Sequence, residues 1–338
     1  MCGPVSKKVP SPAWKPVSVV PVDQFPCTDH VEAVMIFEKD ADAPKGPDRD
    51  DQAKLARRAF AAATTDFSAY EIESAGGAVT ADAVDVAFDA SSDRRSAPGD
   101  GPLIEEHWAR LTQANPKLYN AMKFRFGGAT VAGGRVALKL GLTDYKTFQG
   151  TNLEAKWAVT LQSGEARLAD VLGNAVVVET ADGFVPFLRR SATVGEGQGM
   201  WAFAGGHPEP ADAGAGAHGA AVDCAAIRAE LFAAAAKEVS EETGIPPEAL
   251  SAPLLLGTAV RVVNHRPVLA FAATTTLTRA EVVDKYASAK DAFESTAVEF
   301  VAAQDLVDGA AQPPGPLPGD HAGSLALWVT WKKGQRQV

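Results

Sequence analysis

The sequence has few cysteines, and Cys2, Cys27 and Cys224 lie far apart, with no CxxC pair among them. This spacing excludes a zinc ribbon and a thioredoxin-like redox site as interpretations of the sequence. An odd and sparse set of three cysteines also disfavours a disulfide framework. We therefore expect reduced thiols in an intracellular protein.

Positive charge is also scarce, because 32 Lys and Arg face 42 Asp and Glu, for a formal net charge of −10. A protein whose main partner is nucleic acid is normally basic, since neutralisation of phosphates drives that binding. We therefore expect no nucleic-acid partner. Small phosphorylated ligands stay open, because a few local cations or a bound metal suffice to hold them.

Long apolar runs are missing as well. No stretch approaches the about 18 to 20 apolar residues that a membrane span requires. Residues 1–22 contain Lys7, Lys8, Lys15 and several prolines but no continuous apolar core, which argues against a secretory signal. We expect a flexible arm over residues 1–30, no membrane partner and a cytoplasmic location, with organelle targeting left open.

The chain does have the composition of a globular protein, with 46% hydrophobic and 22% charged residues among its 338. A length of this order favours about two domains. In the first half, the patterns predict a strand over 31–37, helices over 51–70 and 104–113, a β-hairpin over 123–143 around Gly133-Gly134, and a polar loop over 143–152.

In the second half, a hairpin is predicted over 174–190 with its turn at 181–183, followed by a Gly-rich loop at 194–199. Asp223 is a suitable N-cap and Gly244 a suitable terminator for a helix over 224–243. Further strands are expected over 254–263, 267–276 and 297–301, and further helices over 281–289 and 324–331.

The helix over 224–243 concentrates acidic residues. Glu230, Glu238, Glu241 and Glu242 fall within an arc of about 120°. Glu238 and Glu242 repel each other at i, i+4, and both lie near the helix C-terminus, where the macrodipole disfavours anions. A bound cation would relieve both costs, and clustered carboxylates suit Mg²⁺ or Mn²⁺. The alternative is a solvated acidic face.

Residues 237–245 read Lys-Glu-Val-Ser-Glu-Glu-Thr-Gly-Ile and resemble the Nudix hydrolase signature, with Lys237 where arginine is usual. Upstream, Gly205-Gly206-His207-Pro208-Glu209-Pro210 resembles the Gly-Gly-x-x-Glu start of the same signature. The segment between them is longer than usual. Ala229 stands where a glutamate is expected, and Glu230 is a candidate substitute.

A wider resemblance, over about residues 104–305, is to the plant and animal branch of Nudix proteins that cleaves UDP-glucose. It is carried by Lys123-Phe124-Arg125-Phe126, Leu140-Gly141-Leu142-Thr143-x-Tyr145, Phe148-x-Gly150-Thr151-Asn152, Phe187-Leu188-Arg189-Arg190-Ser191 and Glu294-Ser295-Thr296. The resemblance implies an α/β fold, a Nudix α/β/α sandwich with an additional N-terminal α+β domain. We expect the N-terminal domain over 31–165, the Nudix domain over 166–310 with an insertion at 211–222, and a C-terminal segment over 311–338.

The resemblance further implies Mg²⁺-dependent hydrolysis of a nucleotide sugar, UDP-glucose giving UMP and glucose 1-phosphate, with Mn²⁺ as an alternative metal. Two alternatives stay open: another nucleoside diphosphate derivative such as ADP-ribose as the substrate, or a catalytically silent domain that binds a nucleotide. The Nudix signature recognises only the diphosphate, so it does not indicate which of these substrates is used. A homodimer also stays open.

By the same resemblance, Glu238, Glu241 and Glu242 would bind the metal, together with a carbonyl at Gly205 or Gly206. Glu238, Glu242 and Glu294 are the expected catalytic residues, although a loop glutamate such as Glu294 is often only solvated. The candidates for substrate binding are Arg189, Arg190, Arg261, Tyr145, Asn152 and His207. Because Arg189 and Arg190 alternate along a strand, at most one of them points into the site.

Overall fold

The computed structural model describes residues 14–22, 32–39, 66–96, 99–154, 167–192, 194–219 and 222–336. The chain divides into two compact units, residues 1–57 and 58–338. In the first unit, β1 (Trp14–Val22) pairs antiparallel with β2 (Glu32–Lys39), which confirms the strand predicted over 31–37. Most of the helix predicted over 51–70 lies outside the described residues. Its last part is wrong, because residues 66–69 form a turn and Tyr70 begins a strand.

The second unit is built on a mixed four-stranded sheet with the order β3-β10-β11-β7. These strands are β3 (Tyr70–Val79), β10 (Leu254–Arg261), β11 (Arg266–Thr274) and β7 (Gly173–Glu179). The neighbours pair antiparallel except β11 and β7, which are parallel. Because β7, β10 and β11 read as near-continuous apolar runs, both faces of the sheet have to be covered.

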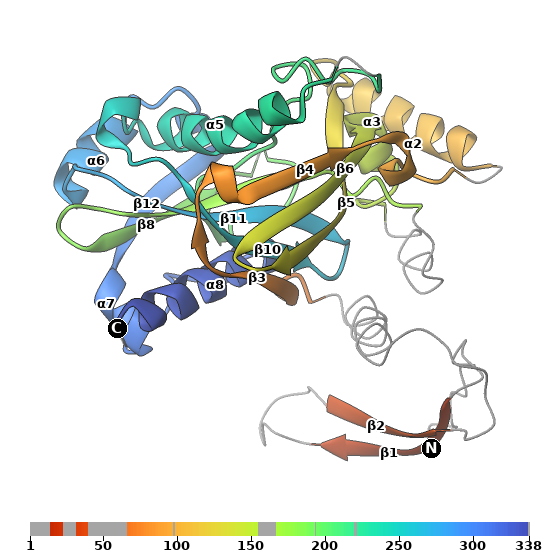
Figure 1. Ribbon diagram of the computed structural model, residues 1–338, viewed down its shortest axis with the longest axis horizontal. Helices are drawn as coiled ribbons and strands as arrows, with labels where there is room; N and C mark the ends of the chain where they lie inside the picture. The colour runs from red at the N-terminus through yellow and green to blue at the C-terminus, as the bar shows by residue number, and fades with distance from the viewer. Residues whose placement is uncertain are drawn as a thin grey trace. The chain divides into compact units, whose positions relative to one another are not determined.

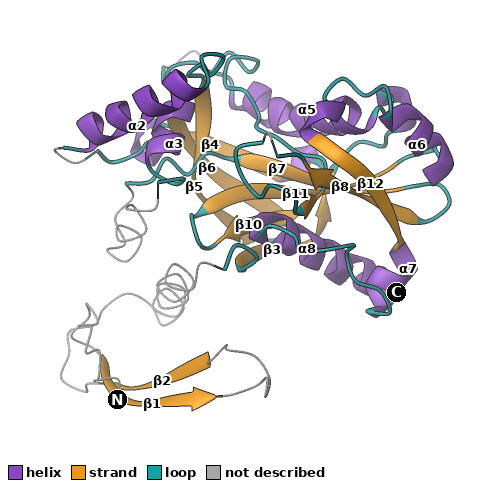
Figure 2. Ribbon diagram, turned by 180° about the vertical axis from the view of Figure 1, so that it is seen from behind, coloured by secondary structure: helices purple, strands orange, loops and turns teal. Residues whose placement is uncertain are grey.

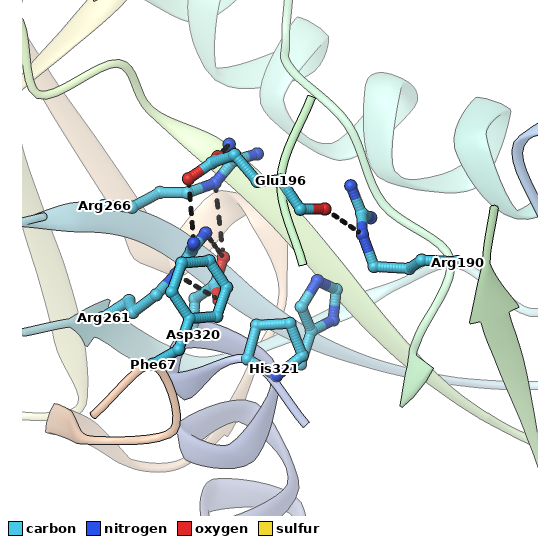
Figure 3. A pocket seen from close by; sticks show the side chains of 8 residues that line it. Phe67, Arg190, Glu196, Arg261, Arg266, Asp320 and His321 are labelled. Carbon is cyan, nitrogen blue, oxygen red and sulfur yellow. Dashed lines mark hydrogen bonds and ion pairs between the residues drawn. The ribbon is translucent and has the colours of Figure 1, made fainter. Parts of the chain in front are cut away.

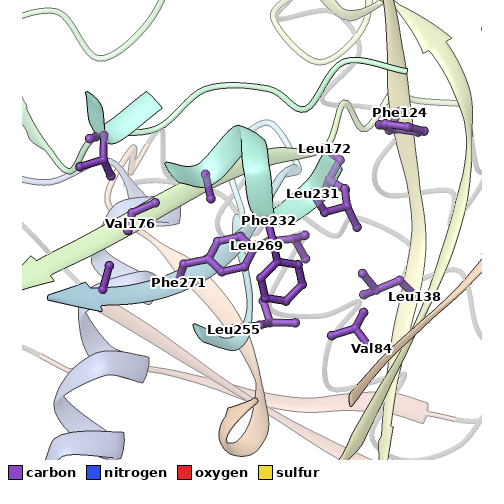
Figure 4. Close-up of a cluster of buried hydrophobic side chains, with 14 of the residues drawn as sticks. Val84, Phe124, Leu138, Leu172, Val176, Leu231, Phe232, Leu255, Leu269 and Phe271 are labelled. Carbon is purple, nitrogen blue, oxygen red and sulfur yellow. The ribbon is translucent and has the colours of Figure 1, made fainter. Parts of the chain in front are cut away.

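Two long helices cover these two faces (Figures 1 and 2). Successive side chains of β7 point to opposite faces. Val176 and Val178 join the hydrophobic cluster that includes Leu231 and Phe232 of α5 (Cys224–Thr243), part of which is drawn in Figure 4. Val177 joins the cluster that includes Trp328 of α8 (Gly319–Gln335). The predicted α/β class and its helix–sheet–helix layering are therefore confirmed.

Two further three-stranded sheets flank this core, with the orders β12-β8-β9 and β4-β6-β5. Their strands are β4 (Val84–Phe88), β5 (Met122–Ala132), β6 (Arg135–Asp144), β8 (Phe184–Arg190), β9 (Trp201–Ala202) and β12 (Ser295–Ala302). The shorter helices are α2 (Asp100–Ala114), α3 (Tyr145–Gly150), α6 (Arg279–Tyr286) and α7 (Ala303–Asp308).

Local signals predicted several elements correctly. The Asp223 side chain accepts a hydrogen bond from the Ala225 amide, and Gly244 ends α5 in the left-handed region at φ 74°. The β5–β6 and β10–β11 hairpins also form as expected. The predicted helix over 324–331 lies inside α8.

Two further predictions were wrong. The turn at 180–183 forms, with the Gly183 amide donating to the Thr180 carbonyl at 2.9 Å, but β7 and β8 enter different sheets. The flank of β7 away from β11 is instead bonded to the Gly-Gly segment, where the Val176 amide donates to the Ala204 carbonyl at 2.9 Å. The loop predicted over 143–152 contains α3, because Asp144 caps its N-terminus by accepting from the Thr147 amide at 2.7 Å.

Strand β3 precedes the expected Nudix domain yet pairs with β10 inside the second unit. The expected boundary at residue 166 therefore lies within one compact unit, and the division into two domains stays a prediction.

Candidate active site

The Gly205-Gly206 segment lies directly against the acidic face of α5. The Gly205 amide donates a hydrogen bond to Oε1 of Glu242 at 3.2 Å. A Cβ atom on Gly206 would lie 2.1 Å from Oε1 of Glu238, so only glycine permits this approach. Asn174 of β7 fixes the segment from the other side, since its Oδ1 accepts from the Gly206 amide at 3.0 Å.

The carboxylates on α5 sit in a strongly unfavourable environment for negative charge. Burial, followed by the charges of Glu241 and Glu294, raises the pKa of Glu238 to about 7. Burial and the charges of Glu238 and Glu294 raise the pKa of Glu242 well above its usual range, while the Gly205 amide and Arg190 act against this shift. Carboxylates that repel one another in a buried position are a favourable place for a cation, which would offset both costs.

Glu294 joins this cluster from the short turn just before β12. It ends the short 3-10 turn Ala292–Glu294, and its carbonyl accepts the Ser191 amide at 2.8 Å. Burial and the neighbouring Asp291 raise the pKa of the Glu294 carboxyl, whereas Arg190 lowers it. The structure thus brings together the three expected catalytic residues, although Glu294 is more than 50 residues from α5 in the sequence.

Glu241 lies at the edge of the cluster. Its Oε1 forms an ion pair with Nζ of Lys290 at 2.6 Å. It is close enough to raise the pKa of Glu238 through its charge. Its expected role as a metal ligand stays a prediction.

Within the described parts of the chain, no group of three or more His, Cys, Asp or Glu side chains is gathered closely enough to hold a metal ion. Mg²⁺ usually needs fewer protein ligands, because one or two carboxylates, several waters and substrate phosphates complete its shell. Glu238 and Glu242 supply hard oxygen atoms beside a glycine cradle that a Cβ would fill. The residues present therefore fit such a cation.

A second group of charged side chains lines a small pocket, shown in Figure 3. Arg261 donates from Nε to Oδ1 of Asp320 at 3.1 Å and from Nη1 to Oε1 of Glu196 at 2.8 Å. Arg266 pairs with the other Glu196 oxygen, and its Nε lies 3.3 Å from Oδ2 of Asp320. Two guanidinium groups therefore share two carboxylates.

The remaining walls of this pocket come from distant segments. The lining residues are Phe67, Arg190, Glu196, Arg261, Arg266, Pro318, Asp320 and His321. The Arg261 guanidinium lies 4.1 Å from the centre of the Phe67 ring. Burial lowers the pKa of His321 to about 4, so this imidazole is neutral near pH 7, and its Nδ1 accepts the Phe203 amide at 3.2 Å.

Arg190 connects the pocket with the glutamate cluster. It lines the pocket, and its charge acts on both Glu242 and Glu294. Arg189 is exposed on the opposite face of β8. The alternation of the strand thus selects Arg190 as the arginine of this pair that points toward the site.

Tyr145 and His207 lie next to Arg266. Nε2 of His207 is 3.4 Å from Nη2 of Arg266, and burial together with the charges of Arg266 and Lys123 lowers the pKa of His207 well below its usual range. The Tyr145 hydroxyl accepts from Nε2 of Gln149 at 2.6 Å, and burial raises its pKa. Both side chains are therefore neutral polar groups beside a guanidinium.

Asn152 is fully engaged with the protein. Its Nδ2 donates to the carbonyls of Asn264 at 2.9 Å and His265 at 3.0 Å, and its Oδ1 accepts the Asp170 amide at 3.1 Å. It holds the β10–β11 turn in place, and its expected contact with substrate stays a prediction.

Glu230 contacts the upstream part of the Nudix signature, residues 205–210. It is the candidate substitute for the usual glutamate. Its Oε1 accepts the Glu209 amide at 3.0 Å, and the Glu209 carboxylate pairs with Lys123. Burial raises the pKa of Glu230. The long insertion thus leaves a glutamate of α5 in contact with the loop.

Sequence reasoning missed Arg266, Glu196, Asp320 and His321. Three of them lie in recognisable local patterns: Glu196 is the one acidic residue of the glycine-rich loop 194–199, and Asp320 and His321 lie in the first turn of α8. What no pattern indicated is their convergence, because about 120 residues separate Glu196 from Asp320.

Known proteins resemble this chain over about two thirds of its length or more. No protein-family model matches the chain. It is 37% identical over 268 residues to Nudix hydrolase 9 of Arabidopsis thaliana, which covers 72% of this chain and 85% of that protein. It is 36% identical over 247 residues to the human uridine diphosphate glucose pyrophosphatase NUDT22, covering 68% of this chain and 82% of that one. The bovine protein of the same name is 38% identical over 230 residues, 63% of this chain and 79% of its own.

A solved structure, the MutT protein from Methanosarcina mazei Go1, aligns with 49% of this chain and 94% of its own at 18% identity and a TM-score of 0.31. This superposition is too loose to support a statement about the protein. The sequence relatives are sufficient: the chain belongs to the Nudix hydrolase superfamily and is an enzyme of that family. In the described part of the chain, no helix combines the length and apolarity needed to cross a bilayer.

Proposed function

We propose that the protein hydrolyses the diphosphate of a nucleotide sugar, with UDP-glucose and water giving UMP and glucose 1-phosphate. The observation that carries the proposal is the set of repelling carboxylates of Glu238, Glu242 and Glu294 beside Gly205-Gly206, adjoined by an arginine-lined pocket. A cation-binding edge next to guanidinium groups suits a diphosphate. The names of the mammalian relatives support UDP-glucose as the substrate.

Glu238 and Glu242 would hold a divalent cation, Mg²⁺ or alternatively Mn²⁺, with Glu241 and the Gly205 carbonyl as further ligands. When bound, such a cation neutralises phosphoryl charge and lowers the pKa of water. The high pKa values of Glu238 and Glu242 support this assignment, since a nearby cation would restore the ionised form of both.

Glu294 is the proposed general base. Hydrolysis forms a bond from a water oxygen to one phosphorus, breaks the bridging P–O bond and releases a proton from the water. A carboxylate whose pKa is raised accepts a proton more readily near neutral pH. The charge of Arg190 acts on Glu294, and its guanidinium would bind a phosphoryl oxygen of the same substrate.

Two alternatives have to be separated from this proposal: another substrate such as ADP-ribose, and a silent domain that only binds nucleotides. A binding-only domain has little reason to keep carboxylates that repel one another, which disfavours the second. The test compares UDP-glucose with ADP-ribose at equal concentration in Mg²⁺, with products separated by ion-exchange chromatography. We expect UMP and glucose 1-phosphate to form faster than AMP. Faster formation of AMP would favour ADP-ribose as the substrate. No product from either compound would favour a domain that only binds nucleotides.

A further inference from the structure

The Glu196 carboxylate fills a site made of converging hydrogen-bond donors. Its oxygens pair with Arg261 at 2.8 Å and with Arg266, and Oε1 also accepts Nδ2 of Asn264 at 2.8 Å. The three donors come from the end of β10, the following turn and the start of β11. The glutamate side chain is only 10% exposed. Two guanidinium groups and an amide around one anion form a donor set that also suits a phosphoryl group.

The two arginines are held in place without Glu196. Asp320, which is 1% exposed, contacts Arg261 at 3.1 Å and Arg266 at 3.3 Å from the side of α8. The Phe67 ring packs against the Arg261 guanidinium. The arginines would therefore keep their arrangement if the glutamate left, which is the property of a preorganised binding site.

The glutamate, by contrast, is delivered by a glycine-rich loop. Gly197 and Gly199 both adopt positive φ angles, 58° and 75°, which favour glycine. A Cβ on Gly197 would lie 3.2 Å from Cγ of Pro318 and 3.4 Å from the Phe67 ring, so the loop packs tightly in its docked position. The backbone of Glu196 is also held by a side chain, because Nε of Arg190 donates a hydrogen bond to the Glu196 carbonyl at 2.9 Å.

The site also faces the proposed reaction centre. Nη2 of Arg266 lies 3.4 Å from Nε2 of His207, the residue after Gly206. Arg190, on the other side of the pocket, interacts electrostatically with Glu242. An anion in place of the Glu196 carboxylate would therefore lie beside the loop that contacts Glu238 and Glu242.

We propose that Glu196 is an internal competitor for an anion site formed by Arg261, Asn264 and Arg266, and that a phosphoryl group of the substrate displaces it. This identification of the ligand rests on the proposed function, whereas the site itself is defined by its donors. Three arginines, Arg190, Arg261 and Arg266, line the pocket against the two acids Glu196 and Asp320. Departure of Glu196 would leave one carboxylate and strengthen the attraction for a phosphoryl anion.

The test measures binding of inorganic pyrophosphate, in the absence of metal, to the full chain by isothermal titration calorimetry. Glu196→Gln removes the competing charge, and we expect its Kd to fall at least about tenfold below that of the unaltered protein. Adding Arg266→Met to this variant should abolish the gain. Glu299→Gln, an exposed glutamate on β12, is the matched control and should leave the Kd unchanged.

A second variant guards against misfolding of the first. Gly197→Ala keeps the glutamate but strains the docked loop, and it should also lower the Kd for pyrophosphate. An unchanged or higher Kd in a folded Glu196→Gln protein overturns the proposal, since Glu196 then supports the site instead of competing for it. If that variant does not fold, the same criterion applies to Gly197→Ala.

Hydrolysis of UDP-glucose is measured separately on the unaltered protein, so the two proposals fail independently. Tighter pyrophosphate binding in Glu196→Gln without any hydrolysis would support the anion site and contradict the proposed function. Hydrolysis with no gain in pyrophosphate affinity would do the reverse.

Discussion

Gly206 and Glu238 approach so closely that a Cβ on the glycine would lie 2.1 Å from Oε1 of the glutamate. The acidic face of α5 and the Gly-Gly segment thus form one unit, with Glu242 held by the Gly205 amide a helical turn away. The position of the Glu238 carboxylate therefore depends on the absence of a side chain at Gly206.

Gly206→Ala should therefore lower activity at least about tenfold, because an added methyl group displaces the Glu238 carboxylate, and small misplacements of catalytic groups are costly. The initial rate of UDP-glucose hydrolysis is the measurement. Gly216→Ala is the control, since a Cβ there meets nothing within 4 Å. Equal rates in the two variants would show that the contact between loop and helix is not needed.

The Glu238 carboxyl should make the metal-free protein less stable as the pH rises from about 4.5 to about 7. The pKa of Glu238 is about 7 in the folded chain against an ordinary 4.5, so this group binds more protons in the folded state than in the unfolded state in this window. The raised pKa values of Glu242 and Glu294 act in the same direction. The lowered pKa values of His207 and His321 act in the opposite direction. The contribution of Glu238 is therefore measured as the difference in the free energy of unfolding in urea between the unaltered protein and Glu238→Gln, at about pH 5 and about pH 8.

Glu238→Gln should make the metal-free protein more stable than the unaltered one at about pH 8, and this gain should be smaller at about pH 5. Mg²⁺ should stabilise the unaltered protein more at the higher pH, where the metal ion no longer competes with protons. A gain from Glu238→Gln that does not grow with pH would mean that the Glu238 carboxyl does not titrate in this window.

Arg266→Met should raise the KM for UDP-glucose by about tenfold or more, because the buried guanidinium is a donor of the proposed phosphoryl site. Steady-state kinetics separate this effect from one on kcat. Arg135→Met removes an exposed arginine that pairs with Asp85 at the surface, and its KM should stay as in the unaltered protein. An unchanged KM in Arg266→Met would place substrate elsewhere.

The network around Asp170, beside the β10–β11 turn, should contribute strongly to stability. Its carboxylate pairs with buried Arg125 at 2.8 Å and with Nδ1 of His265 at 2.7 Å. Asp170→Asn keeps the shape and tolerates the positive φ of 43°, but it leaves the Arg125 charge uncompensated.

We expect Asp170→Asn to cost about 3 kcal/mol in the free energy of unfolding, as for other broken buried pairs. Asp85→Asn, in the exposed pair with Arg135, should cost much less, because solvent screens that pair. Chemical denaturation of the two variants in parallel provides the comparison, and equal losses would contradict the buried character of the network.

Local signals in the sequence predicted elements whose ends depend on near neighbours. The helix α5 begins at its Asp223 cap and ends at Gly244 because both act within a few residues. The pairing of β7 could not be inferred in this way, since its partners are β11 and the distant 204–206 segment. A good turn at 180–183 indicated a hairpin, but the competition for sheet edges is a property of the whole fold.

The candidate site likewise contains one part that local sequence patterns predict and one part that they do not. Glu238, Glu241 and Glu242 share a helix face, so helical periodicity alone places them together. The pocket of Arg261 and Arg266 depends on Glu196 from a loop and Asp320 from α8, which converge only after the sheet and both helices have formed. Spacing in the sequence carries no signal for such contacts.

The most direct test of the account measures UDP-glucose hydrolysis in Mg²⁺ for Glu242→Gln beside the unaltered protein. Glu248→Gln, an exposed glutamate just after the same helix, is the control. The account predicts release of UMP and glucose 1-phosphate by the unaltered protein and the control, and a rate at least about 100-fold lower in Glu242→Gln. Equal rates in all three proteins would contradict a cation site on α5, and with it the assignment of this face as the reaction centre.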